Sequence, residues 1–260
     1  MALNVYAFTC GWLTLPMGLL LQGEKGKLTV PVPSYLIEHP KGRVIFDTGL
    51  HVDTQNEPDR RLGRLASIHT VGFKPGEEIA GRLGALGRKP GEIDLIINSH
   101  LHFDHCGGNQ QLPNATLLIQ RREWEAAHDA DLIESVYYNP QDYDHGHRVR
   151  MIDGEHDVFG DGSVVCIPTH GHTPGHQSLR VQIGSDHVVL TGDACYLRRT
   201  LDELHLPTAM YNREQMIESL KRLRAMRDAG MMIITGHDPE LWQTIPQAPA
   251  QIGFVARAGG

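Results

Sequence analysis

Short apolar runs, separated by turn-forming residues, recur along the whole chain. Runs of this length that are rich in valine, isoleucine and leucine and bounded by Gly, Pro, Asn or Asp are typical of β-strands. They predict strands at residues 34–37, 43–46, 95–97, 115–119, 163–167, 177–183, 188–190 and 231–234. Residues 3–21 are apolar too, but glycine and proline interrupt them, so we expect a strand followed by an apolar loop.

Apolar positions at helical spacing predict three helices between these strands. One covers residues 76–86, one covers residues 122–128, and the longest covers residues 212–227 behind Asn212, a residue type that favours helix N-caps. Strands outnumber helices, which predicts a mixed α/β (α+β) fold with much antiparallel sheet. The polar, arginine-rich segment 52–70 predicts an excursion over or near a functional site.

The composition excludes several classes of protein. The chain has 260 residues and a net charge of −7, which argues against binding to nucleic acid or to an anionic membrane surface. Its four cysteines form no Cys-x-x-Cys pair, so reduced thiols are expected. No basic residue precedes Lys25, so residues 3–21 lack the start of a signal peptide, and their interruptions argue against a membrane span. We therefore expect a cytoplasmic protein.

The unusual count is that of histidine, with 16 copies. Three of them share one short stretch with an aspartate, directly behind the apolar run 95–97 and before two glycines: His100, His102, Asp104 and His105. In an extended segment His100 and His102 lie on the same face, because alternate residues do so. Imidazole and carboxylate groups at this density, at the end of a strand, predict a metal site.

Further potential ligands follow other predicted strands. A catalytic zinc takes three protein ligands and a water, and two metals need more groups than one short stretch offers. His172, Asp193 and His237 each come shortly after an apolar run and beside a glycine, which suits a site built on loops at the end of a rigid sheet. Because ligands from His100 to His237 would converge on one site, residues 1–260 are expected to form a single domain.

The motifs HLHFDH, GHTPGH, GD and GH, in this order and spacing, resemble those of the metallo-β-lactamase superfamily of binuclear metallohydrolases. This resemblance implies a four-layer αββα sandwich with the site at one edge of two sheets. It also implies two divalent metal ions, most simply Zn²⁺, although iron, cobalt or manganese suit the same ligands. The implied ligands are His100, His102 and His172 for the first ion, Asp104, His105 and His237 for the second, and Asp193 as the bridge.

Three details favour one branch of the superfamily. His102 stands where redox members carry a glutamate, and Asp193 supplies a bridging carboxylate that true β-lactamases lack. Tyr196, three residues after Asp193, matches the catalytic tyrosine of the N-acyl-homoserine lactonases, which this sequence resembles most. The implied function is quorum quenching by hydrolysis of the lactone ring of N-acyl homoserine lactones, in a group whose members are often homodimers.

The implied chemistry suits these residues. A hydroxide bridging the two ions would attack the lactone carbonyl, and the first ion together with Tyr196 would stabilise the oxygen on which charge develops. Asp104, or a metal-bound water beside it, would pass a proton to the departing alkoxide, which the second ion could also stabilise. Two alternatives stay open: hydrolysis of a thioester, another lactone or a phosphodiester at the same kind of site, and a non-catalytic metal sensor.

Other residues receive roles outside the ligand set. The residues expected around an acyl chain are Trp12, Met17, Leu19 and Phe103, with Ile68 and Phe73 as further candidates; ordinary core or dimer packing is the alternative for the N-terminal ones. Asp47 matches an early Asp-Thr-Gly turn of the superfamily, which implies that it holds a ligand histidine. His176 is expected to make a structural bond, and His170 is left open.

The last group is expected to be ordinary in function. Cys106 and Cys195 adjoin ligands, but close packing is their expected role. The histidines that fit no pattern and are expected on the surface are His51, His69, His145 and His147.

Overall fold

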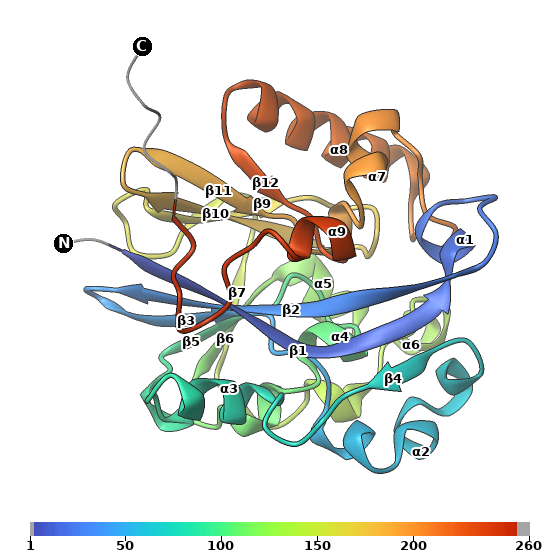
Figure 1. Cartoon of the computed structure of the whole chain (residues 1–260), viewed down its shortest axis with the longest axis horizontal. Coiled ribbons are helices and arrows are strands. Elements are labelled where there is room, and N and C mark those ends of the chain that lie inside the picture. Colours follow the sequence, from blue (N-terminus) through green and yellow to red (C-terminus); the bar gives the residue numbers. More distant parts are fainter. Residues whose placement is uncertain (1–2, 254–260) are drawn as a thin grey trace.

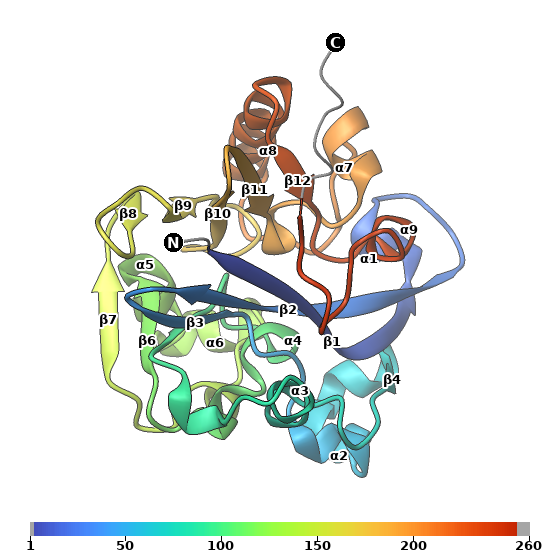
Figure 2. The same cartoon turned by 60° about the vertical axis from the view of Figure 1, so that its left-hand side comes forward.

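The computed structural model describes residues 3–253 as two β-sheets that lie face to face, with helices on both outer sides (Figure 1; Figure 2). The first sheet has seven strands. Across the sheet they are β4 (Thr70–Gly72), β1 (Asn4–Pro16), β2 (Lys27–His39), β3 (Gly42–Phe46), β5 (Leu95–Ile97), β6 (Thr116–Gln120) and β7 (Val149–Ile152). Strands β4 to β3 pair antiparallel, and strands β3 to β7 pair parallel.

The second sheet has five strands. Across the sheet they are β12 (Met232–Ile234), β11 (Asp186–Leu190), β10 (Gln177–Ile183), β9 (Val164–Pro168) and β8 (His156–Asp157). Strands β11 and β12 are parallel, and the other neighbours are antiparallel. Both sheets are therefore mixed, and six of the ten strand pairs among the described residues are antiparallel, which agrees with the prediction of much antiparallel sheet.

The helices are short apart from one. They are α1 (Met17–Leu20), α2 (Pro58–Leu62), α3 (Ile79–Ala85), α4 (Phe103–Cys106), α5 (Arg121–Ala126), α6 (Ala130–Ser135), α7 (Arg198–Glu203), α8 (Arg213–Asp228) and α9 (Pro239–Trp242). Single 3₁₀ turns are η1 (Val52–Gln55), η2 (Gly63–Ser67), η3 (Pro90–Glu92), η4 (Asn109–Gln111), η5 (Pro140–Asp142) and η6 (Gly192–Ala194). Helix α8 begins where the sequence predicts, because the Asn212 side chain accepts a hydrogen bond from the backbone N–H of Gln215 at 3.0 Å.

Alternation along the strands builds three apolar layers. In β3, Val44 and Phe46 face the second sheet, while Ile45 faces helix α3 on the outside. In β11, Val188 points toward the first sheet and Val189 points toward helices α7 and α8. One core therefore lies between the sheets and one lies under each outer set of helices, which gives the predicted αββα sandwich.

The predicted elements are found, although several bounds differ and the expected apolar loop after the first strand contains the short helix α1. Each predicted strand lies within or overlaps an observed one, and the predicted helices correspond to α3, α5 and α8. Strand β2 begins well before the predicted run because Pro31 and Pro33 mask its start in the sequence. These prolines pair with Trp12 and Thr9, on either side of a β-bulge in β1, where missing N–H donors are tolerated.

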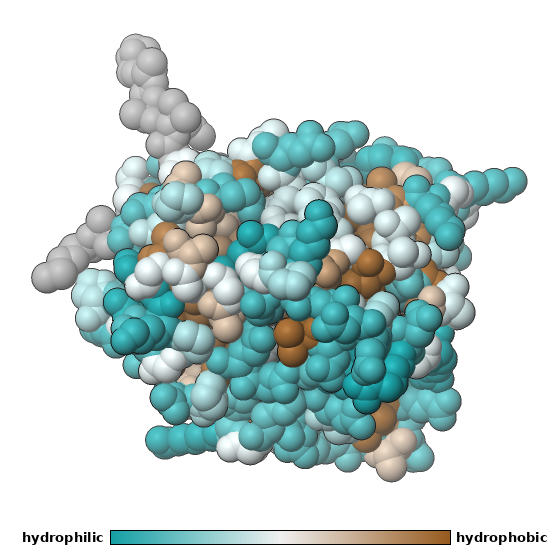
Figure 3. Space-filling view, turned by 60° about the horizontal axis from the view of Figure 1, so that its bottom comes forward, coloured by the Kyte–Doolittle hydropathy of each residue, from teal (hydrophilic) through white to brown (hydrophobic). Residues whose placement is uncertain are grey.

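Two further features are the hydropathy of the surface and the length of the helices. The face shown in Figure 3 is mostly hydrophilic, and its hydrophobic residues form small separate patches. Within residues 3–253 there is no helix long and apolar enough to cross a membrane.

Candidate metal centre

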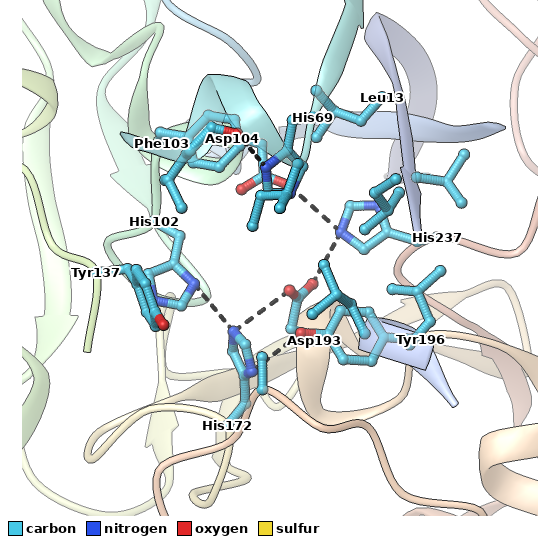
Figure 4. A pocket seen from close by; sticks show the side chains of 17 residues that line it. Leu13, His69, His102, Phe103, Asp104, Tyr137, His172, Asp193, Tyr196 and His237 are labelled. Atoms are coloured by element: carbon cyan, nitrogen blue, oxygen red, sulfur yellow. Dashed lines mark hydrogen bonds and ion pairs between the residues drawn. The ribbon is translucent and has the colours of Figure 1, made fainter. Parts of the chain in front are cut away.

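The predicted ligands lie on loops that follow strands of both sheets. Strands β3 and β5 are parallel, so the loops after them leave the same edge of the first sheet. Strands β9, β11 and β12 also share one direction, because β9 and β11 both pair antiparallel with β10. These two sets of loops meet at one end of the sandwich, where their polar side chains point toward one another (Figure 4).

Seven side chains form two groups there. The ligand atoms within each group lie within 4.8 Å of one another, and the groups are His100, His102, His172 and Asp193, and Asp104, His105 and His237. All are buried except His102, which is half-buried. The structure thus brings together the seven residues that the sequence predicts as ligands, with Asp193, the predicted bridge, grouped with the first three histidines.

In the first group three ring nitrogens converge. Nε2 of His100 lies 2.9 Å from Nδ1 of His102, and Nε2 of His172 lies 3.2 Å and 3.0 Å from these two atoms. Zn–N bonds of about 2.05 Å in tetrahedral geometry place ligand nitrogens about 3.3 Å apart. The spacing is therefore close to that of three nitrogens on one metal ion.

The opposite ring nitrogens show which of these atoms carry protons. The Ser99 hydroxyl donates to Asp47 at 2.8 Å and therefore accepts from Nδ1 of His100 at 2.9 Å. Nε2 of His102 donates to the Val136 carbonyl at 2.7 Å. A neutral imidazole carries one N–H, so His100 and His102 turn lone pairs toward each other and toward His172.

The pKa values agree with neutral rings in the first group. Burial lowers the pKa of His100 and His172 well below the usual value, and neighbouring imidazoles lower both further. Burial also lowers the pKa of His102. Neutral imidazole is the form that binds metals.

The two histidine rings of the second group are also oriented by hydrogen bonds, but to different partners. Nδ1 of His105 donates to Asp47 at 2.9 Å, and Nδ1 of His237 donates to the Pro31 carbonyl at 2.8 Å. Their Nε2 atoms both lie 3.1 Å from Oδ1 of Asp193 and 3.7 Å from Oδ2 of Asp104. Asp47 thus holds a ligand histidine, as predicted.

The side chains of His105 and Asp193 are placed unfavourably unless a cation lies between them. Nε2 of His105 and Oδ1 of Asp193 are buried without a hydrogen-bond partner although they face each other. Burial opposes charge on His105 and His237, yet Asp193 and Asp104 raise the pKa of both, so the site favours positive charge. Imidazole and carboxylate ligands that converge in this way fit divalent metal ions.

Asp193 lies between the two groups. Its Oδ2 is 3.4 Å from Nε2 of His172, and its Oδ1 faces the second group. Its backbone N–H donates to Nε2 of His176 at 3.0 Å, and Nδ1 of His176 bonds the hydroxyl of Thr169 at 2.9 Å. His176 therefore makes the structural bond that was predicted, and it fixes the backbone of Asp193.

Tyr196 borders both groups, as Figure 4 shows. Its hydroxyl lies 3.1 Å from Nδ1 of His172, and its ring stacks near that of His237, with centroids 5.7 Å apart. Burial raises the pKa of its phenol well above the usual value, and the carboxylates of Asp193 and Asp104 raise it further. The phenol therefore keeps its proton.

A cavity opens above the two groups. Its floor includes ligand residues and Tyr196. Its apolar walls come from strands β1 and β2, from helix α1 and from the segment 52–70, and include Leu13, Leu15, Leu20, Val30 and Ile68. The segment 52–70 thus lies at the site, as its sequence predicts.

Two of the four predicted wall residues line this cavity and two do not. Phe103 and Leu19 are in the lining, but Trp12 and Met17 are not. Alternate residues of a strand face opposite sides, so Leu13 points into the cavity while Trp12 packs against the core between the sheets. Met17 lines a separate groove together with Leu28 and Leu197.

Several histidines also differ from the expectation of a surface position. His51 is buried, and its Nδ1 accepts from the backbone N–H of Asp53 at 3.1 Å. His69 lines the cavity, edge-on to the Phe103 ring with centroids 5.5 Å apart. His147 is half-buried and only His145 is exposed. Isolated histidines give no sequence signal that separates these cases.

The structure also shows where the residues lie whose roles the sequence left open. His170 belongs to neither ligand group and bonds the His176 carbonyl through Nδ1 at 3.2 Å. Cys106 and Cys195 are buried in two different cores, as expected. No sequence pattern indicated Glu123, a buried carboxylate that bonds both histidine-bearing loops.

Two mixed sheets between helices, with clustered histidines and aspartates at the strand ends, define a metallohydrolase-like architecture. The family model of the Metallo-beta-lactamase superfamily matches residues 29–237. The chain therefore belongs to this superfamily.

Several known proteins are similar to this chain over most of its length. The N-acyl homoserine lactonase AttM of Azorhizobium caulinodans is 34% identical over 235 residues, which cover 88% of this chain and 89% of that protein. The N-acyl homoserine lactonase AiiA of Bacillus thuringiensis subsp. kurstaki is 32% identical over 217 residues, or 82% and 83% of the two chains. A structure of an N-acyl homoserine lactone hydrolase, with N-hexanoyl-L-homoserine bound at its catalytic metal center, has a TM-score of 0.87 at 29% identity and covers 97% of this chain and 100% of its own.

Proposed function

We propose that this protein is a metal-dependent lactonase that opens the ring of N-acyl homoserine lactones, the activity that its relatives' names state for them. One observation carries the proposal most directly. The two ligand groups and Tyr196 form the floor of a cavity whose walls are apolar. Such a site suits a substrate that joins a hydrolysable polar ring to a hydrocarbon chain.

The ligand groups would each hold one divalent cation, with one oxygen of Asp193 toward each. Zn²⁺ is the first choice because it takes nitrogen and oxygen ligands, and iron, cobalt or manganese suit them as well. Two such cations would lower the pKa of a water molecule toward neutrality and polarise the ester carbonyl. Hydrogen bonding to the substrate and proton transfer would depend on side chains of the protein.

Tyr196 is suited to donate a hydrogen bond to the ester oxygen on which negative charge develops. When Nε2 of His172 acts as a ligand, its Nδ1 carries the proton and donates to the phenol oxygen, 3.1 Å away. The phenol proton then remains available to the substrate. A buried donor in a low-dielectric site stabilises developing charge strongly.

Asp104 is suited to move the proton that the leaving alkoxide needs. It lines the cavity, its side chain is 11% exposed, and its Oδ2 lies 3.7 Å from Nε2 of both His105 and His237. One oxygen can thus serve as a ligand while the other meets the substrate. Proton transfer from a placed carboxyl group typically accelerates a step by about 10²–10⁴.

The cavity walls favour a neutral substrate. Of the residues that the structure describes, no lysine or arginine lines this cavity. A phosphodiester would leave its charge without a cationic side chain, which makes a nuclease-like activity the weaker choice. An acyl chain instead gains roughly 0.8 kcal/mol for each methylene that it buries.

The test is a direct assay. Purified protein with about two ions per chain is incubated with N-hexanoyl- and N-decanoyl-homoserine lactone, and acid release and ring-opened product are measured. An acyl thioester and a phosphodiester are assayed in parallel. We expect turnover of the lactones that a chelator abolishes and divalent metal restores. Turnover of the thioester without turnover of either lactone would contradict the proposal.

We further propose that the enzyme acts in the cytoplasm and forms a homodimer. All four cysteines are buried and unpaired, which suits a compartment that keeps thiols reduced. Light scattering of the purified protein tests the dimer, and cell fractionation tests the location.

A further inference from the structure

Glu123 is a buried carboxylate without a cationic partner. It lies in the first turn of α5, directly behind β6, and its side chain has no exposure to solvent. No ion pair joins it to a lysine, arginine or histidine within residues 3–253. A carboxylate in such a place is rare, because burial of an unpaired charge is strongly unfavourable unless hydrogen bonds replace the lost water.

Four hydrogen bonds replace that water, two on each oxygen. Oε1 accepts from the backbone N–H of Leu101 at 3.0 Å and from the hydroxyl of Tyr138 at 2.9 Å. Oε2 accepts from the hydroxyl of Thr173 at 2.7 Å and from the backbone N–H of Gly175 at 2.9 Å. Because backbone N–H groups only donate, this pattern fits the ionised carboxylate, which only accepts.

Three of the four donors belong to the segments that carry the first ligand group, and the fourth lies beside a residue that bonds His102. Leu101 stands between His100 and His102, and Thr173 follows His172 directly. Tyr138 is two residues beyond Val136, whose carbonyl accepts from Nε2 of His102. One carboxylate thus ties together the three loops that place all three histidines of this group.

The backbone is adapted to this contact. A Cβ atom at Gly175 would lie 2.1 Å from the backbone nitrogen of Glu123 and 2.6 Å from its Cα. Only glycine lets the loop after His172 approach the helix so closely. The histidines of the second group have other partners: Asp47 holds His105, and the Pro31 carbonyl holds His237.

We propose that Glu123 is a positioning residue that holds His100, His102 and His172 in the arrangement of the first metal site, and that it does so as an anion. The proposal rests on the metal binding assumed in the proposed function, but not on the identity of the substrate. Its negative charge also partly offsets the positive charge of a bound cation. Removal of such outer partners typically weakens metal affinity by about 10–100-fold.

The test is a metal titration that needs no substrate. Metal-free wild type, Glu123→Gln, Glu123→Asp and Asp47→Asn are titrated with Co²⁺ against a competing chelator, and the visible spectrum of bound Co²⁺ is recorded. Glu125→Gln, which changes an exposed glutamate of the same helix, is the matched control. Hydrolysis is then measured at stoichiometric and at excess metal.

We expect Glu123→Gln to weaken one of the two Co²⁺ sites by about 10–100-fold and to leave the other within about threefold. Asp47→Asn should weaken the second site, and the first site as well, because Asp47 holds His105 directly and His100 through Ser99. Glu123→Asp should recover part of the loss because it keeps the charge. Excess metal should restore hydrolysis by Glu123→Gln, since a positioning residue acts through metal binding. If Glu123→Gln does not fold, Tyr138→Phe, which removes one of the four donors, should weaken the same site by a smaller factor.

Three outcomes would overturn the inference. Unchanged affinity and spectrum in Glu123→Gln, or in Tyr138→Phe if the former does not fold, would show that Glu123 serves only the fold. Equal weakening of both sites would show a general loss of structure. Failure of the wild type to bind metal would remove the basis of this inference and of the proposed function together. A wild type that binds two ions but hydrolyses no lactone would contradict the proposed substrate and leave the assignment of Glu123 standing.

Discussion

Replacement of Tyr196 by phenylalanine removes one hydroxyl from the floor of the cavity and leaves the seven ligand side chains in place. Two effects follow from its surroundings. The substrate loses a hydrogen-bond donor at the position where charge develops, and Nδ1 of His172 loses the oxygen that lies 3.1 Å away. The first effect concerns the rate, and the second concerns stability.

The magnitudes of the two effects differ. Loss of a buried oxyanion donor lowers kcat by about 10²–10³, and the lower value is expected where cations share the charge. A buried N–H without an acceptor costs about 1–3 kcal/mol, and each kcal/mol lowers the Tm of a chain of this size by about 2–4 °C. We expect kcat for N-hexanoyl-homoserine lactone to fall about 100-fold, with KM nearly unchanged because the donor acts in the transition state.

The matched control is Tyr143→Phe. Tyr143 is also buried, and its hydroxyl donates to the Ala127 carbonyl at 2.6 Å, but it does not line the cavity. This variant should lose stability and keep its activity. Activity of Tyr196→Phe within about fivefold of the wild type, far from the expected 10², would refute the role of the phenol. Loss of metal from this variant would instead assign the effect to His172.

Three further predictions concern metal binding, strain and pH. Asp193→Ala removes the carboxylate that faces both groups, so metal analysis should give at most one tightly bound ion per chain, and retention of two would exclude bridging. Tyr137 has φ of 65°, a conformation that costs a side chain about 1–2 kcal/mol, so Tyr137→Gly should melt higher than Tyr137→Ala; the reverse order would show that the backbone is not strained. Hydrogen bonds from Arg88 and Arg43 lower the pKa of Glu38, and a lowered carboxyl pKa stabilises the fold above the unfolded value and ceases to do so as the pH falls through the folded one. Glu38→Gln should therefore lower the Tm by roughly 2 °C at pH 7 and converge with the wild type below about pH 4, which thermal scans at both pH values would check.

The local pattern of the sequence was sufficient for most elements and for the seven side chains that the structure brings together. The run 95–97 and the histidines behind it can be read without a structure, because strand ends, glycine turns and ligand types are all local properties. The same holds for Asn212, whose N-cap role depends on its immediate neighbours. The expectation of a single domain stays a prediction.

The groups that hold the ligands could not be found in this way. The carbonyls of Pro31 and Val136 bind ligand histidines that lie 206 and 34 residues away in the chain, and a backbone carbonyl has no residue type that could reveal it. In the sequence, nothing distinguishes Glu123 from an exposed glutamate on a helix. Its burial depends on the loops after β5 and β9, which meet only when the two sheets pack together.

The sequence by itself determined which atoms can bind metal and which strands precede them, because residue type and hydrophobic periodicity are properties of the sequence. The tertiary structure decided which nitrogen of each histidine faces the site, that Leu13 rather than Trp12 lines the cavity, and that His69 lies at the substrate side. These outcomes depend on contacts between segments distant in the chain. Hydrogen bonding and packing act on distances in space, which sequence separation does not record.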